Sequence, residues 1–172
     1  MPDPRYPIGP FERHSSIDER LRSTLIGQIR EAPARLREAV RGASEELLET
    51  PYRPGGWTVR QVVHHLADSH LHAYLRSKFI VTEREPTVKP YDQSVWAELH
   101  DARKAPVELS LGLLDAVHNR WVLFLESLEP ADFSRTFHHP EHGDDRLDGL
   151  VDLYAWHGRH HVAQIESLRG KR

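Results

Sequence analysis

Apolar side chains recur at helical spacing along four long stretches of the chain. The first stretch opens at Ser16, where serine is followed three residues later by glutamate, the capping-box pattern that starts many helices. Its apolar positions are Leu21, Leu25, Ile29, Leu36 and Val40. Residues three or four apart lie on one helix face, so this stretch predicts an amphipathic helix. Pro33 falls inside the run and is expected to kink or divide it.

A second capping box, from Thr58 to Gln61, predicts a helix that runs to about Glu83. The preceding segment 50–56 holds two prolines and two glycines, which predicts a firm break between the first two long helices. One short helical turn is expected before this break, at residues 44–48.

The third and fourth stretches complete the set of long helices. Pro106 suits the first turn of the third helix, and residues 129–130 end it. Its apolar stripe consists of Leu113, Val117, Trp121, Phe124 and Leu128. The fourth helix is predicted to start within residues 145–148 and to end near Gly170. Its inward stripe consists of Leu150, Tyr154, His157, His161, Ile165 and Leu168.

Four amphipathic helices without a convincing run of alternating strand residues predict an all-α fold, a four-helix bundle. The link between the second and third helices spans roughly 20 residues, which permits a long crossover loop between parallel neighbours. Within this link residues 94–99 are expected to form a short helix, whereas residues 130–146 are expected to be polar and irregular. We expect a single domain over residues 1–172, with a proline-rich extended arm at 1–15.

The bulk composition excludes several classes of function. The net charge is −3, from 23 Lys and Arg against 26 Asp and Glu, which gives no basic surface for nucleic acid. The chain holds no cysteine, so disulfides, thiolate metal sites and a cysteine nucleophile are ruled out. No apolar run approaches the roughly 20 residues that span a bilayer, and the N-terminus shows no apolar signal segment. We therefore expect a cytoplasmic protein with no membrane or nucleic-acid partner.

Histidine is unusually common, with 13 in the chain. His157 and His161 lie one helical turn apart on the apolar stripe of the last helix, so both are expected to point inward. Two imidazoles at this spacing can bind one metal ion at about 2.0–2.1 Å, as in other helical zinc sites. Two partly buried core histidines are the alternative interpretation. His160 points about 100° away from His161 and is expected at the surface or an interface.

A second histidine cluster lies on the second helix, within residues 62–72. His64 and His65 cannot both face inward, and periodicity favours His65 while leaving His64 open. Asp68 lies one turn from both, where it would hold the second nitrogen of a ligand or act as a catalytic base. A plain surface aspartate is the other interpretation of Asp68.

The remaining histidines and the tryptophans carry weaker signals. His70 is expected at the edge of the core and His72 toward solvent, while Trp57 and Trp121 are expected in the core. One loop cluster consists of His138, His139 and His142. It would either approach a metal or substrate or remain solvated. We assign no role to the isolated His14, His100 and His118.

Four segments of the chain together resemble one known family. Residues 52–70, YRPGGWTVRQVVHHLADSH, look like the second-helix signature of the YfiT-like branch of the DinB superfamily. Residues 154–161, YAWHGRHH, look like its last-helix signature, and the segments 6–9 and 89–91 are similar to that branch as well. The resemblance covers nearly the whole chain.

This resemblance implies a four-helix bundle that holds one divalent metal ion per chain through three histidines. Carried onto this sequence, the ligand pattern corresponds to His65, His157 and His161. Members of the family are described as metal-dependent hydrolases, usually assigned zinc, with nickel also seen, and homodimers are common. Related branches include S-transferases that use a low-molecular-weight thiol such as bacillithiol or mycothiol.

Two reaction classes and one non-catalytic role are consistent with such a site. As a metal-dependent hydrolase, the protein would activate water at the three-histidine site against an ester, amide or similar carbon of a small molecule. As a thiol S-transferase, it would activate the thiolate of a co-substrate, which needs basic anchors in the pocket. Four arginines are available as anchors: Arg53, Arg60, Arg76 and Arg159. As a binding module, it would use a metal closed by four protein ligands only for stability.

Overall fold

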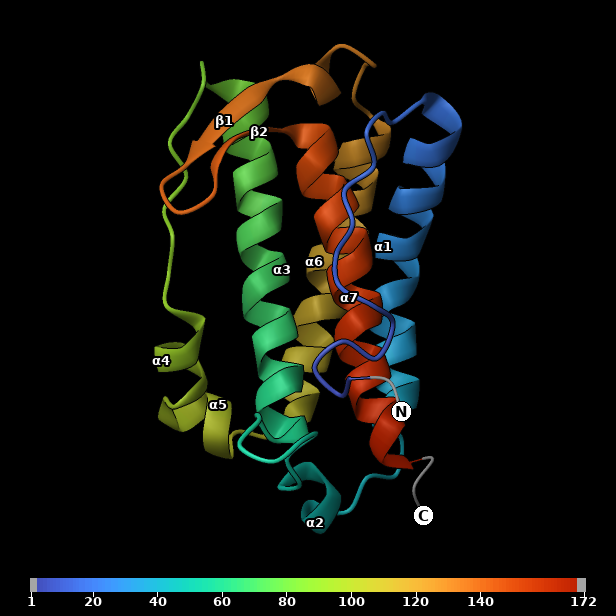
Figure 1. The fold of residues 1–172 in the computed structure, drawn as a ribbon, viewed down its shortest axis with the longest axis vertical. Helices are drawn as coiled ribbons and strands as arrows, with labels where there is room; N and C mark the ends of the chain where they lie inside the picture. The colour runs from blue at the N-terminus through green and yellow to red at the C-terminus, as the bar shows by residue number, and fades with distance from the viewer. Residues whose placement is uncertain (1–2, 170–172) are drawn as a thin grey trace.

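The computed structural model describes residues 3–169, and the described part forms a bundle of four long helices (Figure 1). These are α1 (Glu19–Ala39), α3 (Val59–Thr82), α6 (Val107–Glu126) and α7 (Leu147–Arg169). α1 and α7 run in one direction and pack against each other, while α3 and α6 run in the opposite direction. This arrangement confirms the predicted all-α four-helix bundle.

The link from α3 to α6 makes the predicted long crossover. Because α3 and α6 both run from the lower to the upper end in Figure 1, the chain returns along the outside of the bundle between them. On the way it forms two short helices, α4 (Gln93–Ala97) and α5 (His100–Lys104), of which the sequence pattern predicts only the first. Both short helices contact α3, which holds the return segment against the bundle. The short helix α2 (Glu45–Leu48) forms as predicted.

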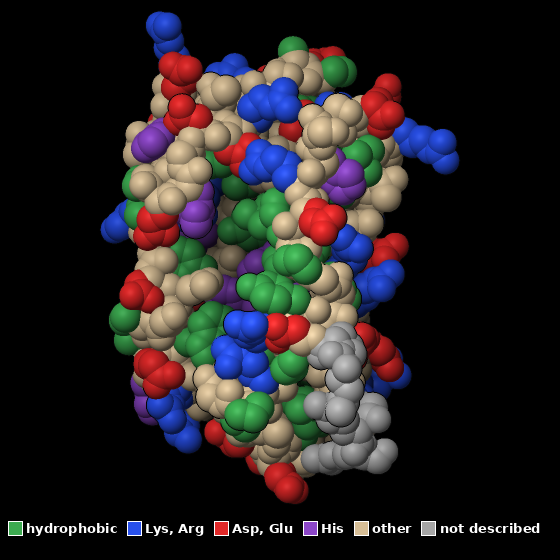
Figure 2. Space-filling model, viewed as in Figure 1, with side chains coloured by type: hydrophobic (Ala, Val, Ile, Leu, Met, Phe, Trp, Pro, Cys, Tyr) green, Lys and Arg blue, Asp and Glu red, His purple; other side chains and the backbone are tan. Residues whose placement is uncertain are grey.

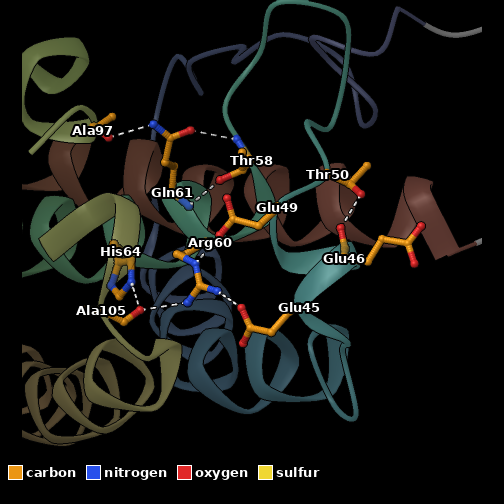
Figure 3. Close-up of polar contacts among 10 residues, drawn as sticks. All are labelled: Glu45, Glu46, Glu49, Thr50, Thr58, Arg60, Gln61, His64, Ala97 and Ala105. Atoms are coloured by element: carbon orange, nitrogen blue, oxygen red, sulfur yellow. Dashed lines mark hydrogen bonds and ion pairs between the residues drawn. The ribbon is translucent and has the colours of Figure 1, made fainter. Parts of the chain in front are cut away.

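Capping residues begin both α3 and α1, but only α3 begins at the predicted residue. The Thr58 side chain accepts a hydrogen bond from the Gln61 backbone N–H, and the Gln61 side chain accepts one from the Thr58 N–H (Figure 3). The predicted capping box of α3 is therefore confirmed. α1 starts later than predicted, because Asp18 rather than Ser16 caps it and accepts from the Leu21 N–H at 2.7 Å. Aspartate binds the free N–H groups of a first turn as well as serine does.

Two further details of the long helices differ from the sequence pattern. α1 is continuous through Pro33, which therefore does not divide it. In α6 the buried stripe is rotated from the predicted one, because Leu113 is 41% exposed while Leu111 and Leu114 are buried. Apolar residues are so frequent in α6 that several stripes fit helical spacing, and packing against α1 and α3 selects among them.

A short β-hairpin replaces the irregular loop predicted before the last helix. Strands β1 (Thr136–His139) and β2 (Gly143–Arg146) pair antiparallel after a single 3-10 turn, η1 (Asp132–Ser134). Gly143 has a φ of +79°, a left-handed conformation that glycine adopts without strain. Each strand has four residues, which is too short for alternation to stand out in the sequence.

A layer of histidines divides the apolar core into two clusters. In α3 one cluster ends at Leu66 and the other begins at Ala73, and in α7 the change falls between Ala155 and Val162. His70 of α3 and the three histidines of the last-helix signature lie between these points, while His64 and His65 lie just before Leu66. Buried imidazoles in place of apolar side chains need hydrogen-bonding partners or a metal ion.

An ion-pair network in which the arginine is buried and the glutamates are exposed fixes the start of α3 (Figure 3). Arg60 is 5% exposed and pairs with Glu45 and, at 2.8 Å, with Glu49. Its guanidinium also donates to the Ala105 carbonyl at 2.9 Å. α2, the first turn of α3 and the junction of α5 with α6 are thereby held together, so Arg60 is a structural residue rather than a pocket anchor.

The N-terminal segment before α1 is irregular and lies along the outer face of α7 (Figure 1). The Trp156 indole N–H donates to the Gly9 carbonyl at 3.3 Å, which fixes the segment beside the last-helix signature. Residues 1–2 of the predicted arm and residues 170–172, with the predicted helix end near Gly170, lie outside the described residues. Within residues 3–169, no helix is both long enough and apolar enough to cross a membrane.

Candidate metal centre

Three of the predicted histidines meet in the histidine layer of the bundle. His65 comes from α3, and His157 and His161 come from successive turns of α7. One ring nitrogen of each lies within 4.8 Å of the other two. The Nε2 atoms of His65 and His157 are 3.3 Å apart although the residues are 92 positions apart in the chain. The packing of α3 against α7 brings these side chains together.

The spacing of the nitrogens fits a small divalent cation. Around a tetrahedral ion with metal–nitrogen distances of about 2.05 Å, the ligand nitrogens lie roughly 3.3 Å apart. The Nε2 atoms of His65 and His157 have this separation, 3.3 Å. Two ring nitrogens that face each other need either a proton or a cation between them. The hydrogen bonds behind each ring show which of its two nitrogens carries the proton.

Burial keeps all three rings in the neutral form that binds metal ions. Burial, followed by nearby His160, lowers the pKa of His65 to about 4. Burial, followed by neighbouring histidines, lowers the pKa of His157 and of His161 well below the ordinary value. At neutral pH each ring therefore offers a lone pair and carries no charge that would repel a cation.

A ladder of hydrogen bonds behind His157 determines which of its nitrogens is free. The His118 Nδ1–H donates to the Ile29 carbonyl at 2.6 Å, so His118 Nε2 is an acceptor. The His70 Nδ1–H donates to that nitrogen at 2.8 Å, and the His157 Nδ1–H donates to His70 Nε2 at 3.1 Å. Because a carbonyl oxygen only accepts, every step has one direction in the neutral rings. The ladder leaves a lone pair on the His157 Nε2 atom that faces His65.

A second hydrogen-bonded support lies behind His161. The His161 Nδ1–H donates to the Gln164 side-chain oxygen at 2.8 Å. The Gln164 amide nitrogen donates to the Arg5 carbonyl at 3.3 Å and to His160 Nε2 at 3.0 Å, which fixes the orientation of the amide. Partners of this kind orient metal-binding imidazoles and raise their basicity. His157 and His161 thus both present lone pairs on Nε2, which is the form in which an imidazole binds a metal ion.

The three histidines line a cavity of about 510 Å³ that opens to solvent. Figure 2 shows a hollow near the middle of this face, with histidine side chains at its floor. Arg5 and Arg53 also line the cavity. Its aromatic lining residues are Tyr6, Tyr52, Trp57 and Trp156. A cavity of this size accommodates a small-molecule ligand.

The structure directs His64 and His65 to different partners. The His64 ring contacts the Ser110 hydroxyl at 2.7 Å and the Ala105 carbonyl at 3.1 Å (Figure 3 shows the second contact). His65 is the residue of the pair that reaches His157. The alternative that sequence periodicity leaves open is thus decided by the rotation of α3.

Asp68 is half buried and lies outside the three-histidine cluster. The hydrogen bonds of residues 3–169 include none from Asp68 to His65, His157 or His161. Burial, followed by the charge of Asp101, raises the pKa of Asp68 to about 6. A base role for Asp68 near neutral pH therefore stays a prediction.

Several other histidines lie elsewhere than their sequence context predicts. His70 is fully buried rather than at the core edge, and His160 is buried and stacks on Trp156 at 4.4 Å rather than facing solvent. His72 is half buried and stacks on Tyr91 at 4.4 Å. In the hairpin, His139 is buried while His138 and His142 are exposed, and none of them joins the three-histidine cluster.

The supports behind the rings of His157 and His161 are the residues that sequence reasoning misses. His118 had one usable signal, since it follows Leu111 and Leu114 on the buried stripe of α6 as the polar member of that stripe. Gln164 lies three residues after His161 and so shares its helix face. The signal at His118 does not identify its partners, because Ile29 and His70 lie on two other helices, α1 and α3.

Comparison with known proteins places these residues in a family context. A family model described as the DinB superfamily matches residues 28–165. Proteins of Bacillus mycoides (strain KBAB4) and Bacillus cereus (strain B4264) are each 52% identical over 169 residues, which is 98% of this chain and 97% of theirs. Both are named "Putative metal-dependent hydrolase".

Two solved structures share the architecture. YfiT from Bacillus subtilis matches with a TM-score of 0.95 and 43% identity, over 98% of this chain and 97% of that one. It is described as a probable metal-dependent hydrolase with an unusual four-helix bundle topology. TT2238, a four-helix bundle protein, matches with a TM-score of 0.58 and 21% identity, over 87% of this chain and 98% of that one. The second likeness supports the fold alone.

Proposed function

This chain belongs to the DinB superfamily, and on that premise we propose that it is a hydrolase dependent on one divalent metal ion. We propose His65, His157 and His161 as the ligands. The observation that carries the proposal is the pair of Nε2 atoms 3.3 Å apart at the base of a solvent-open cavity. Zinc suits an all-imidazole ligand set, and nickel is the alternative ion.

The chain's own residues orient the site and handle protons. An ion bound by three neutral imidazoles keeps its full charge and lowers the pKa of water in an open position from about 15.7 to about 7. His70 and Gln164 hold the rings of His157 and His161 in place, so little reorganisation is needed. We propose Asp68 for proton transfer because it lies one helical turn after His65 on α3, and burial, followed by the charge of Asp101, raises its pKa to about 6.

The decisive test combines metal content with product identification. The purified protein is expected to hold one divalent ion per chain by inductively coupled plasma mass spectrometry. It should hydrolyse members of an ester and amide panel, and His161→Ala should lose both metal and turnover while the helical circular dichroism signal remains. Full metal occupancy without hydrolysis of any panel member would contradict the hydrolase assignment.

A thiol S-transferase is the second candidate, and the lining of the cavity favours it. Arg5 and Arg53 line the cavity beside the polar Gln93 and Ser94, and such groups would anchor the acidic and sugar parts of a low-molecular-weight thiol. Of the four arginines predicted as anchors, only Arg53 lines this cavity. Incubation with a thiol and an electrophile separates the two candidates, since a thioether product identified by mass spectrometry supports the transferase.

A metal that only stabilises a binding module would need a closed site. The described residues supply three ligands to this cluster, and a structural zinc site uses four. We therefore expect the metal-free chain to stay folded. Loss of the cooperative unfolding transition on addition of a chelator would support the structural role instead.

A further inference from the structure

Arg76 is a buried arginine without an acidic partner. It lies on α3 and is 9% exposed, and no Asp or Glu within residues 3–169 forms a salt bridge with it. Its Nη2 donates to the Lys89 carbonyl at 2.7 Å, whereas its Nε is buried and has no partner among the described residues. Buried charges in proteins are normally paired, so this guanidinium is unusual unless a ligand completes it.

The groups that surround Arg76 are mostly basic or hydrogen-bond donors. Burial, followed by the charges of Arg76 and Lys89, lowers the pKa of His72. Burial, followed by the charge of Arg76, lowers the pKa of His139, on which the exposed Glu141 acts in the opposite direction. His139 Nδ1 accepts from the Glu141 N–H at 3.2 Å, so the neutral ring carries its proton on Nε2. The charge of Arg76 therefore acts on one ring from α3 and on one ring from β1.

Hydroxyl groups lie between Arg76 and the proposed metal centre along α3. His65, Ser69 and Arg76 share one face of α3, and the first and last of them lie about 16 Å apart along the helix axis. The Ser69 hydroxyl donates to the Tyr154 hydroxyl at 3.4 Å. Burial raises the pKa of Tyr91 to about 12, while a hydrogen bond with Ser69 acts in the opposite direction, so this phenol stays a neutral donor.

We propose that Arg76 is the centre of an oxyanion subsite that binds the carboxylate or phosphate group of a small-molecule ligand. The planar guanidinium fork matches either group, and two of its nitrogens, Nε and Nη1, have no protein acceptor within residues 3–169. That this ligand is the substrate of the metal centre rests on the proposed function, whereas anion binding at Arg76 does not.

The first test titrates the metal-loaded protein with inorganic phosphate and, separately, with succinate, at constant ionic strength set by sodium chloride. The Nε–H resonance of Arg76 in a nitrogen–proton NMR spectrum is expected to shift and to saturate. The thermal midpoint should rise by about 2–4 °C, the shift that corresponds to roughly 1 kcal/mol for a domain of this size. A larger response to phosphate or to succinate identifies which acid the subsite prefers.

Variants locate the binding site. Arg76→Met should abolish the response and Arg76→Lys should weaken it at least tenfold. Arg35→Met, which changes an exposed arginine paired with Glu31, should leave it intact. If Arg76→Met fails to fold, the titrations of the wild-type protein and of Arg76→Lys still show whether the anion binds at Arg76. An unshifted Arg76 resonance in the wild-type protein overturns the proposal.

The same titration on His161→Ala separates this inference from the proposed function. An anion bound to the metal would lose its effect in His161→Ala and keep it in Arg76→Met, and that pattern overturns the subsite. An anion bound at Arg76 gives the reverse pattern, even if the protein proves to bind no metal.

Discussion

At the scale of single residues, the partner behind a ring distinguishes a metal-binding imidazole from a core histidine. His118 has no contact with the proposed metal, yet its hydrogen bonds to Ile29 and His70 set the tautomer of His157. We predict that His118→Leu weakens zinc binding about 10–100-fold, as second-layer partners of metal ligands usually do. Competition with a fluorescent chelator measures this affinity.

The matched control for that variant is His100→Leu, which changes an exposed histidine of α5. It should keep the wild-type affinity for zinc. Equal affinities for the two variants would show that the ladder does not determine the tautomer of His157.

His64 and His65 provide a second comparison at this scale, because they are adjacent and of the same type. His65→Ala is expected to lose stoichiometric metal, whereas His64→Ala should retain it. The His64 change should lower the free energy of unfolding by about 1 kcal/mol through the lost contacts with Ser110 and Ala105. Metal analysis and urea denaturation of both variants check this, and the opposite pattern of metal loss would mean that α3 is rotated.

The sequence predicts part of this residue-level arrangement. The inward positions of His157 and His161 follow from their spacing on the stripe of α7. Periodicity favours His65 over His64 but does not fix which of the two faces inward. What fixes it is the network of Arg60 and Gln61, whose partners lie in α2 and in the segment after α3. Contacts between distant segments leave no periodic trace, which is why the sequence does not predict them.

At the scale of elements, Gly158 controls how closely α7 approaches α1. A Cβ at this position would lie 3.1 Å from the Ala32 Cβ and 3.5 Å from the His70 Cε1. We predict that Gly158→Val destabilises the protein by about 1–3 kcal/mol through overpacking and weakens metal binding by displacing His70. Thermal unfolding and zinc affinity measure the two effects.

Gly27→Val on α1 is the control, because a Cβ there meets no atom within 4 Å. Valine is also a slightly better helix former than glycine, so the thermal midpoint of this variant should be unchanged or a little higher. A similar loss of stability in both variants would show that the cost at Gly158 does not come from its close approach to Ala32.

The ion pairs of Arg60 are expected to hold the short helices against α3, and variants test this. Arg60→Ala removes a buried charge that pairs with Glu45 and Glu49, and should cost about 1–3 kcal/mol of unfolding free energy. Arg35→Ala removes an exposed pair with Glu31 and should change stability by less than about 0.5 kcal/mol. Urea denaturation of both variants tests the difference, and equal costs would show that the ion pairs of Arg60 stabilise the protein no more than an exposed pair does.

The sequence predicts the long helices better than it predicts the hairpin. α3 and its capping box follow from local sequence, because Thr58 and Gln61 satisfy each other within one turn. The hairpin does not, because its strands are short and β1 gains further support from a backbone contact between Val88 and His138 in a distant segment. Local chemistry therefore predicts where long helices begin, whereas packing between segments decides the shorter elements.

At the scale of the whole molecule, the histidine layer couples metal binding to the stability of the bundle. The two apolar clusters on either side of the layer supply the core, while the layer itself holds several imidazoles that are buried without charge. Such a layer is stable only while the rings stay neutral, so proton binding and metal binding should act on it in opposite directions.

The pH dependence of unfolding follows from this coupling. An unfolded histidine titrates near 6.5, whereas burial lowers the pKa of His65 and of His118 to about 4. Between these values the unfolded chain binds more protons, so the free energy of unfolding falls as pH falls, by up to about 1.4 kcal/mol per pH unit for each such ring. Urea denaturation of the chelated protein should show a plateau above pH 7 and a steep loss between pH 6.5 and 4.

Zinc should shift that loss to lower pH, because the ion binds the deprotonated rings of the folded state and so stabilises it. The comparison is made at pH 6, where the zinc-loaded protein should have the higher urea midpoint. His118→Leu should reduce the slope of the metal-free curve, since it removes one of the buried titrating rings. A metal-free protein whose stability stayed constant from pH 6.5 to 5 would show that the layer takes up protons without cost, and the neutral lone pairs on which the proposed site depends would then not be enforced by the fold.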